Sequence, residues 1–230
     1  MATRSSYGQF CPISMAAEVV CTRWTALVLR ELLCGSTRFT EIRRGVPKMS
    51  PTLLSKRLKE LEEAGVLTAD PRPDGNADYR LTEMGEELRP LIMGLGTWAQ
   101  HWVESKLSLR NLDASLLMWD MRRSIDRRPL PDRRCTVHFL YPELPEVSQS
   151  WWMVIEPGGI DLCSFDPGHE IDLLVRGPLL SMTSVWMGLA NLNSEIAAGR
   201  ISVDGDPAIA RTMRDWLGLS VFAREPRRVA

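Results

Sequence analysis

The sequence predicts an α+β protein made of two domains. The chain has 230 residues, which is more than one typical domain requires. Apolar residues recur every three or four positions over most of residues 12–107, whereas strand-like runs alternate with helical ones beyond residue 113. We therefore expect a domain at residues 1–108 and a second at residues 109–230.

The composition is that of a globular protein, with 44% apolar and 25% charged residues. No apolar run approaches the ~18 residues that a bilayer-spanning helix needs. The segment Met1–Ser6 lacks the apolar core of a secretory signal. The five cysteines are scattered without the spacing of a zinc site or a CxxC motif. We expect a cytoplasmic protein with no membrane partner, no metal and no cofactor.

Four helices are expected in the first part of the chain, at about residues 12–20, 23–34, 39–44 and 50–64. The segment Gly45–Met49 predicts a turn, because Gly and Pro cannot continue a helix. Ser50 is a favoured N-cap, and Pro51 is tolerated at the first helical position. A short helix, a turn and a longer capped helix follow one another here.

Two strand-like runs follow, Val66–Ala69 and Tyr79–Thr82, and the segment between them is rich in turn residues. Strand, polar tip and strand make the outline of a wing. A long helix is expected from Glu83 to Leu107, and its apolar stripe consists of Leu88, Leu91, Leu95, Trp98 and Trp102. We expect this stripe to face a second subunit; packing on its own domain is the alternative.

Positive charge is concentrated before and within the fourth helix. Seven basic residues and one acid, Glu41, lie between Arg38 and Lys59, although the whole chain has a net charge of −1. Such an excess suits the neutralisation of phosphates. At about 100° per residue, the leucines of the fourth helix share one face and its polar residues point away from it. A helix of this kind suits the major groove of DNA, the alternative being an ordinary solvated surface helix.

The residues expected to contact DNA comprise the exposed base-reading candidates of the fourth helix, the phosphate-binding candidates around it and one wing residue. They are Arg38, Arg43, Arg44, Lys48, Ser50, Thr52, Ser55, Lys56, Lys59 and Arg72.

The chain resembles the HxlR-type winged helix-turn-helix regulators of bacteria over about residues 10–104. The matching segments are Cys11-Pro12, Trp24-Thr25 with Leu29–Leu33, Arg38–Arg43, Ser50–Glu62, Tyr79–Thr82 and Gly85. The resemblance implies a homodimer, paired through the first and last helices of the domain, that binds an inverted-repeat operator.

Two departures from the family pattern concern turns. Cys21-Thr22-Arg23-Trp24 stands where relatives often have Gly-Gly before Lys-Trp, and the wing tip Asp74–Asp78 is acidic where relatives often have basic residues. Several family members also sense electrophiles or oxidants through a cysteine at the position of Cys11. The helix expected to begin at Pro12 favours a thiolate there; a structural thiol is the alternative.

The segment Ile196–Pro207 resembles the closing strand and helix of sterol carrier protein type two-like domains, and the order of elements over about residues 113–220 is similar. That resemblance implies a five-stranded, mostly antiparallel sheet enclosing an apolar tunnel. The strand-like runs lie near 135–141, 151–156, 159–165, 170–176 and 200–204; the helices are expected at 113–127, 178–198 and 207–218, and residues 223–230 as a frayed tail.

Large apolar side chains of this second part are candidates for binding a ligand, because aromatic and Met-rich linings suit an adaptable pocket. Filling the core is the alternative for each of them. The candidates are Trp119, Trp151, Trp152, Phe165, Met182, Trp186 and Trp216. Trp151 and Trp152 are adjacent and must face opposite sides of a strand.

Together these patterns favour a bacterial transcriptional regulator that binds operator DNA as a homodimer and responds to a small apolar or amphipathic effector. One alternative is a redox or electrophile sensor acting through Cys11. A second is a lipid or small-molecule carrier with a vestigial DNA-binding module, against which the basic stretch argues. The three histidines lie in unrelated contexts without a nucleophile motif, so an enzyme is not expected.

Overall fold

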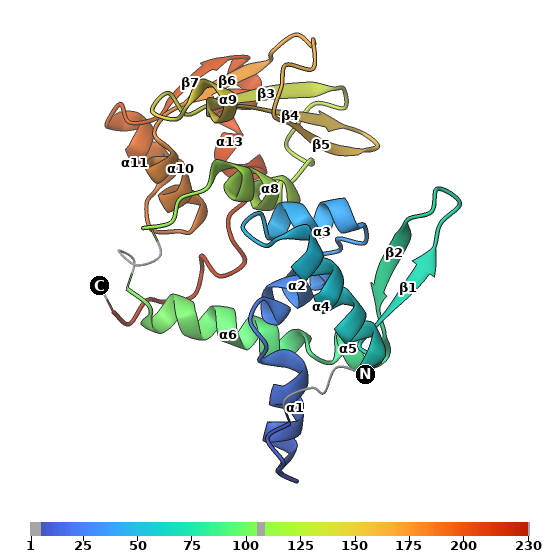
Figure 1. The fold of residues 1–230 in the computed structure, drawn as a ribbon. Helices are drawn as coiled ribbons and strands as arrows, with labels where there is room; N and C mark the ends of the chain where they lie inside the picture. The colour runs from blue at the N-terminus through green and yellow to red at the C-terminus, as the bar shows by residue number, and fades with distance from the viewer. Residues whose placement is uncertain (1–5, 105–108, 230) are drawn as a thin grey trace. The chain divides into compact units, whose positions relative to one another are not determined.

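The computed structural model describes residues 6–104 and 109–229, which fall into two compact units, Met1–Leu95 and Gly96–Ala230 (Figure 1). The boundary between the units lies inside helix α6 (Arg89–Trp102), whereas the sequence places the domain junction at residue 108. The N-terminal segment before Ser6, the expected end of the long helix and that junction lie outside the described residues.

The first unit is built from helices and one two-stranded sheet. Its elements before α6 are α1 (Pro12–Val20), α2 (Thr25–Leu33), α3 (Phe39–Gly45), α4 (Pro51–Glu63), β1 (Leu67–Pro71), β2 (Ala77–Leu81) and α5 (Glu83–Glu86). Apolar side chains of α2, α3 and α4 form one buried cluster with Val66 and Leu67. A helix-turn-helix followed by a hairpin is therefore present.

The ends of α4 follow from local chemistry. The Ser50 hydroxyl accepts a hydrogen bond from the amide of Leu53 at 3.3 Å, and Pro51 occupies the first helical position. Gly65 follows the helix with a φ of +75°, a conformation that glycine adopts without strain.

The wing is an antiparallel pair in which Leu67 lies opposite Leu81 and Pro71 opposite Ala77. Residues before α3 add to its edge, because Arg38 forms a bridge with Asp78 and the amide of Tyr79 donates to the carbonyl of Thr37 at 2.7 Å. The wing is thus tied to the beginning of α3.

The prediction of one continuous helix from Glu83 is wrong. The structure has the short α5 and then α6, which begins at Arg89. Pro90 lies in the first turn of α6, where its missing N–H costs nothing, but it could not continue a helix from the preceding turn. The break therefore has a local cause.

The second unit has a five-stranded sheet with strand order β5-β4-β3-β6-β7. The β3–β6 pair is parallel and the other three pairs are antiparallel. The elements are α8 (Ala114–Ser124), β3 (Cys135–Leu140), α9 (Glu146–Gln149), β4 (Ser150–Glu156), β5 (Gly159–Cys163), β6 (Leu173–Arg176), α10 (Leu179–Trp186), α11 (Leu192–Ala197), β7 (Ser202–Gly205), α12 (Pro207–Arg211) and α13 (Met213–Trp216).

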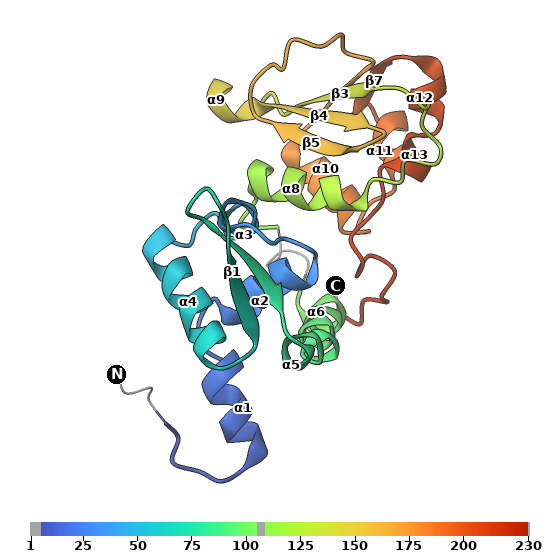
Figure 2. The ribbon, with the colours of Figure 1, turned by 90° about the vertical axis from the view of Figure 1, so that its right-hand side faces the viewer.

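Helices cover one face of this sheet (Figure 2). Side chains of α8, α10 and α13 pack there against alternate residues of the strands, among them Val137, Phe139 and Met153. This cluster is the core of the second unit.

Two helices expected in this unit are each divided. The helix expected over 178–198 is broken after α10, where Gly188 has a φ of +74° and a Cβ atom would lie 2.7 Å from the carbonyl oxygen of Ala223. The helix expected over 207–218 is divided at Thr212, between α12 and α13. Both predictions of a single helix are wrong.

The prediction of a frayed tail is also wrong for residues 223–229. Within the second unit, the amide of Arg228 donates to the carbonyl of His101 at 2.9 Å, and the Arg227 side chain donates to the carbonyl of Val103. The Phe222 ring lies where a side chain at Gly96 would have to be, since a Cβ atom there would be 2.2 Å from Cζ. The tail is docked on the end of α6.

No single helix among the described residues is long and apolar enough to span a membrane. Among the described helices, only α1 and α2 taken together have the length and composition of a membrane span, and the pair is bent by 79° at the break between them.

Candidate nucleic-acid interface

Helix α4 separates its apolar and polar residues cleanly. Leu54, Leu58 and Leu61 are buried in the core of the first unit. The side chains expected to contact DNA from this helix and its cap are all exposed: Ser50, Thr52, Ser55, Lys56 and Lys59. The helix therefore presents hydroxyl and ammonium groups to solvent, the arrangement that a helix in the major groove requires.

The two lysines of α4 remain available for an external partner. Lys56 is 63% exposed and its ammonium lies 4.0 Å from Glu60; Lys59 is 75% exposed and lies 4.0 Å from Glu63. Exposed pairs of this length contribute little to stability. Either ammonium can leave its carboxylate for a phosphate at small cost.

One basic residue of the positive stretch, Arg57, has a structural role and is not available to DNA. Arg57 is mostly buried; its Nε donates to the carbonyl of Arg23 at 3.1 Å and its guanidinium pairs with Glu60. This bond fixes the turn before α2, where Trp24 has a φ of +79°. The turn that departs from the family pattern is thus held by α4.

The remaining basic residues lie at exposed positions on and near the turn between α3 and α4. Arg38, Arg43, Arg44 and Lys48 are all exposed. The only acid of the stretch, Glu41, accepts hydrogen bonds from the amides of Thr37 and Arg38 at 3.0 and 3.1 Å. Because this carboxylate caps its own helix, the exposed surface keeps its positive excess.

A partly buried ion pair that the sequence analysis did not identify positions the turn between α3 and α4. Glu31 is 0% exposed and accepts from Arg30 at 2.7 Å, while the same guanidinium donates to the carbonyl of Gly45 at 2.8 Å. The signal in the sequence was an acid at position 31, on the same helical face as Val28 and Leu32. The pair joins α2 to the end of α3.

The wing carries paired charges. The Arg72 guanidinium lies 3.2 Å from the Asp78 carboxylate and 3.5 Å from that of Asp74. The hydrogen bond to Asp78 raises the pKa of Arg72, and the hydrogen bond from the amide of Asn76 lowers the pKa of Asp74. Arg72 is therefore engaged by two acids of its own hairpin, and its side chain is 28% exposed.

The stripe expected at a subunit interface is largely exposed. Leu91, Leu95 and Trp102 are exposed and Trp98 is 60% exposed, whereas Leu88 packs against the core of the first unit. Helix α1 has no buried residue, and Ile13 and Met15 on it are exposed. Cys11 is its N-cap residue and is partly exposed.

The residues expected to bind a ligand in the second unit do not form one group. Trp151, Met182 and Trp216 belong to the core cluster, and Trp186 packs at its edge. Phe165 is instead 70% exposed on the loop after β5.

The remaining two tryptophans make separate contacts. The guanidinium of Arg122 lies 4.2 Å from the ring centroid of Trp119. Trp152 stacks on His138 with the centroids 4.5 Å apart, on the opposite face of β4 from Trp151.

Helix α4 has a buried leucine face and exposes hydroxyl and ammonium groups on the other. A tight turn precedes it and a two-stranded wing follows it. This arrangement defines a helix-turn-helix transcriptional regulator. The model of the HxlR-like helix-turn-helix family matches residues 19–107. The chain belongs to this family.

Individual relatives agree with this assignment. The chain is 38% identical over 99 residues to YvaP of Bacillus subtilis (strain 168), described as an uncharacterized HTH-type transcriptional regulator; the match covers 42% of this chain and 92% of that protein. It is 32% identical over 97 residues to the HTH-type transcriptional regulator YodB of the same organism, covering 41% of this chain and 87% of YodB.

Solved structures with similar segments include the reduced form of YodB, at 31% identity and a TM-score of 0.37, covering 42% of this chain and 97% of that one. The reduced form of the redox regulator HypR gives 26% identity and a TM-score of 0.37, covering 39% and 90%.

Proposed function

We propose that this regulator binds an inverted-repeat operator as a homodimer, with α4 of each subunit in the major groove. The observation that carries the proposal is the exposure of Ser55 and Lys56 on a helix whose other face is buried leucine. Hydroxyl and ammonium groups at such positions reach base edges in the groove.

The other exposed residues would hold the DNA backbone. Lys59 lies one turn further along α4, and Arg43 and Arg44 lie at the end of α3, where side chains meet phosphates rather than bases. Arg38 and Lys48 extend this positive surface, and the N-terminus of α4 at Ser50 and Thr52 adds backbone N–H groups. Arg72 is the wing's candidate for the minor groove.

We assign dimerisation to the exposed apolar residues of α1 and α6. A soluble monomer rarely exposes so many large apolar side chains on two helices. The pairing would place two copies of α4 at half-sites about one helical turn of DNA apart.

The second unit would bind a small apolar or amphipathic effector, as its resemblance to sterol carrier domains implies. Effector binding can alter operator affinity only by favouring one dimer geometry over another. Palmitate is a suitable probe of this part of the proposal. If palmitate binds and the operator affinity does not change, the second unit does not act as a sensor of such an amphipathic effector.

Redox sensing through Cys11 is the second candidate. Cys11 is partly exposed at the N-cap of α1, and YodB has been solved in diamide-treated and quinone-bound forms. If Cys11 senses oxidants, diamide will change operator affinity in the wild type and not in Cys11→Ser.

The central experiment is selection of binding sites from random DNA with the full chain, followed by affinity measurements on the selected operator. We expect Ser55→Ala and Lys56→Ala each to weaken binding by about 5- to 150-fold, because the loss of a base contact costs ~1–3 kcal/mol. Lys59→Ala should instead weaken all sequences alike and reduce the salt slope by about one.

Arg211→Ala is the matched control, because Arg211 is exposed in the second unit. Recovery of no preferred sequence, or equal affinity of Lys56→Ala and the control, would refute the role of α4.

A further inference from the structure

The turn between α1 and α2 is strained at one residue. Trp24 has a φ of +79° and a ψ of −21°, and in the described part of the chain no other residue except glycine has a positive φ. The Trp24 carbonyl accepts hydrogen bonds from the amides of Leu27 and Val28 at 3.0 Å each, at the start of α2. A conformation of this kind persists only where neighbouring contacts hold it. Contacts that hold Trp24 therefore stabilise the turn.

Arg57 of α4 makes such a contact. Its Nε donates at 3.1 Å to the carbonyl of Arg23, which belongs to the peptide bond leading into Trp24. The Arg57 side chain is 12% exposed. At about 100° per residue, Arg57 lies ~60° to one side of Leu54 on α4, whereas Lys56 lies ~160° to the other side. Arg57 is therefore on the flank of α4 that meets the turn, and Lys56 is on the side that faces solvent.

Glu60 joins Arg57 to the DNA-reading side of α4. Its Oε2 pairs with the Arg57 guanidinium, and its Oε1 lies 4.0 Å from the ammonium of Lys56. The mostly buried arginine anchors this carboxylate, so the carboxylate biases where the exposed lysine lies in the absence of DNA. A binding group is placed accurately when the side chains behind it are themselves fixed by packing and hydrogen bonds.

We infer that Arg57 is a positioning residue for DNA recognition, which ties the α1–α2 turn to α4 and orients Lys56 through Glu60 without touching DNA. The inference rests on the proposed function, in which Lys56 reads base edges. Arg57 thereby governs how well the operator is distinguished from other sequences, and it adds little to the charge-driven affinity that all sequences share. In the proposed dimer α1 pairs the two subunits, so the same bond links the pairing helix to the reading helix.

The test compares Arg57→Lys with the wild type, in the full chain, on the selected operator and on an unrelated duplex of the same length. Lysine keeps the positive charge, but a single ammonium cannot reproduce the grip of a guanidinium on a carbonyl and a carboxylate at once. We expect operator affinity to fall about 5-fold or more, with affinity for the unrelated duplex unchanged. Unaltered discrimination in the folded variant would overturn the inference.

The salt dependence of binding separates positioning from phosphate contact. Arg57→Gln should lose discrimination as Arg57→Lys does, and its salt slope should stay close to that of the wild type. Lys59→Ala should reduce the slope by about one. A slope reduced as far in Arg57→Gln as in Lys59→Ala would make Arg57 a phosphate ligand and overturn the inference.

The first control makes the same substitution at an exposed arginine. Arg43 lies near the end of α3 and is expected to meet phosphate, where an ammonium serves as a point charge. Arg43→Lys should therefore leave discrimination unchanged. A loss of discrimination as large as that of Arg57→Lys would show that any arginine of this surface has the same effect, against a special role for Arg57.

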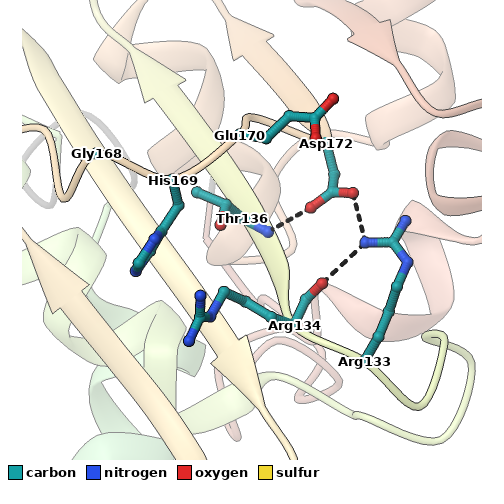
Figure 3. A pocket seen from close by; sticks show the side chains of 7 residues that line it. All are labelled: Arg133, Arg134, Thr136, Gly168, His169, Glu170 and Asp172. Atoms are coloured by element: carbon teal, nitrogen blue, oxygen red, sulfur yellow. Dashed lines mark hydrogen bonds and ion pairs between the residues drawn. The ribbon is translucent and has the colours of Figure 1, made fainter.

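The second control makes the substitution at an arginine of the second unit with similar bonds. Arg133 donates to the carbonyl of Arg134 at 2.8 Å and to the Asp172 carboxylate at 2.6 Å, beside a pocket of about 280 Å³ (Figure 3). The same carboxylate accepts from the amide of Thr136 at 2.8 Å. Arg133→Lys removes bonds of the same kinds, so it should alter stability and leave discrimination unchanged. Equal loss of discrimination in Arg133→Lys and Arg57→Lys would attribute the effect to stability and overturn the inference.

The hydrogen bond to the turn can be observed without DNA. In the ¹⁵N-labelled full chain, the Nε–H of Arg57 should exchange with water about 10-fold more slowly than that of exposed Arg43, or slower still. Equal exchange rates would overturn the inference and leave the proposed function standing. Recovery of no preferred sequence by the wild type would instead refute the proposed function, and with it the role of Arg57, even if the Nε–H exchanged slowly.

Discussion

The carboxylate of Glu31 occupies the space that a side chain at position 45 would need. A Cβ atom on Gly45 would lie 1.8 Å from Cδ of Glu31. The Arg30 guanidinium donates both to that carboxylate and to the carbonyl of Gly45. The backbone at Gly45 therefore lies against the ion pair and leaves no room for a methyl group.

We therefore expect Gly45→Ala to destabilise the protein by about 1–3 kcal/mol, because either the methyl group or the buried pair must move. Urea unfolding measures the loss. Gly94→Ala is the control: nothing lies within 4 Å of a Cβ there, and alanine should stabilise α6 by about 0.5–1 kcal/mol. Equal urea midpoints for Gly45→Ala and wild type would contradict the packing described.

The acids of the wing should weaken DNA binding. Replacing Asp74 and Asp78 by Asn removes two negative charges and releases Arg72 from its partners. We expect operator affinity to rise roughly 3- to 10-fold at ~0.1 M salt, where charges near the DNA are only partly screened. Fluorescence anisotropy measures it.

A matched control removes the same charge from the second unit. Asp161→Asn with Asp204→Asn changes two exposed acids of the second unit. If the wing variant and this control bind the operator equally well, the wing does not approach the DNA.

The exposed stripe of α6 should govern oligomeric state. Leu95→Glu with Trp98→Glu places two charges among exposed apolar groups and should raise the dimer dissociation constant by ~100-fold or more. Sedimentation equilibrium measures it, with Phe165→Glu as an exposed aromatic control in the second unit. A double variant that remains dimeric would exclude this stripe as the interface.

Stability should fall on acidification because of His138. Burial beside Trp152 lowers the pKa of His138 below its ordinary value of 6.5, with Asp166 opposing the shift. The unfolded chain therefore binds a proton before the folded one does. The contribution of neutral His138 is complete above pH 6.5 and is lost as pH falls from there through the folded pKa.

Urea unfolding at about pH 7.5 and pH 5.5 tests this linkage. The wild type should lose more stability between the two values than His138→Gln does, whatever the variant's absolute stability. A wild-type loss no larger than that of the variant would contradict the assignment.

The docked tail predicts a coupling between two distant residues. Gly96→Ala alone should destabilise, because its methyl group would strike the Phe222 ring. In a Phe222→Ala background the same change should stabilise α6 by about 0.5–1 kcal/mol. A thermal-unfolding double-mutant cycle gives the coupling, and additive effects would show that the tail does not hold this position.

The features that the sequence predicts correctly are those whose cause is local. The leucine period of α4, its Ser50 cap and its Pro51 start lie within one stretch of chain, and the structure places them as expected. The break before α6 also has a local signal, because Pro90 lies inside the segment predicted as one helix.

Other features depend on contacts between distant segments, for which no local pattern exists. The Glu31–Gly45 contact, the seat of Phe222 at Gly96 and the meeting of Thr136 with Asp172 each join residues that the sequence separates. The sequence also placed Phe165 among the ligand-binding candidates, at the end of the strand-like run expected over 159–165. In the structure β5 ends at Cys163, and the ring is exposed.

The single parallel pairing in the sheet has a kinetic consequence. Strands β3, β4 and β5 are consecutive and antiparallel, so they can assemble through short connections. The pairing of β6 with β3 instead spans the whole of β4 and β5 and closes a longer stretch of chain. Ordering this longer segment costs more chain entropy before the stabilising contacts between β3 and β6 form. The loop between β5 and β6 belongs to that segment, so we expect it to become ordered after the β3–β4–β5 meander.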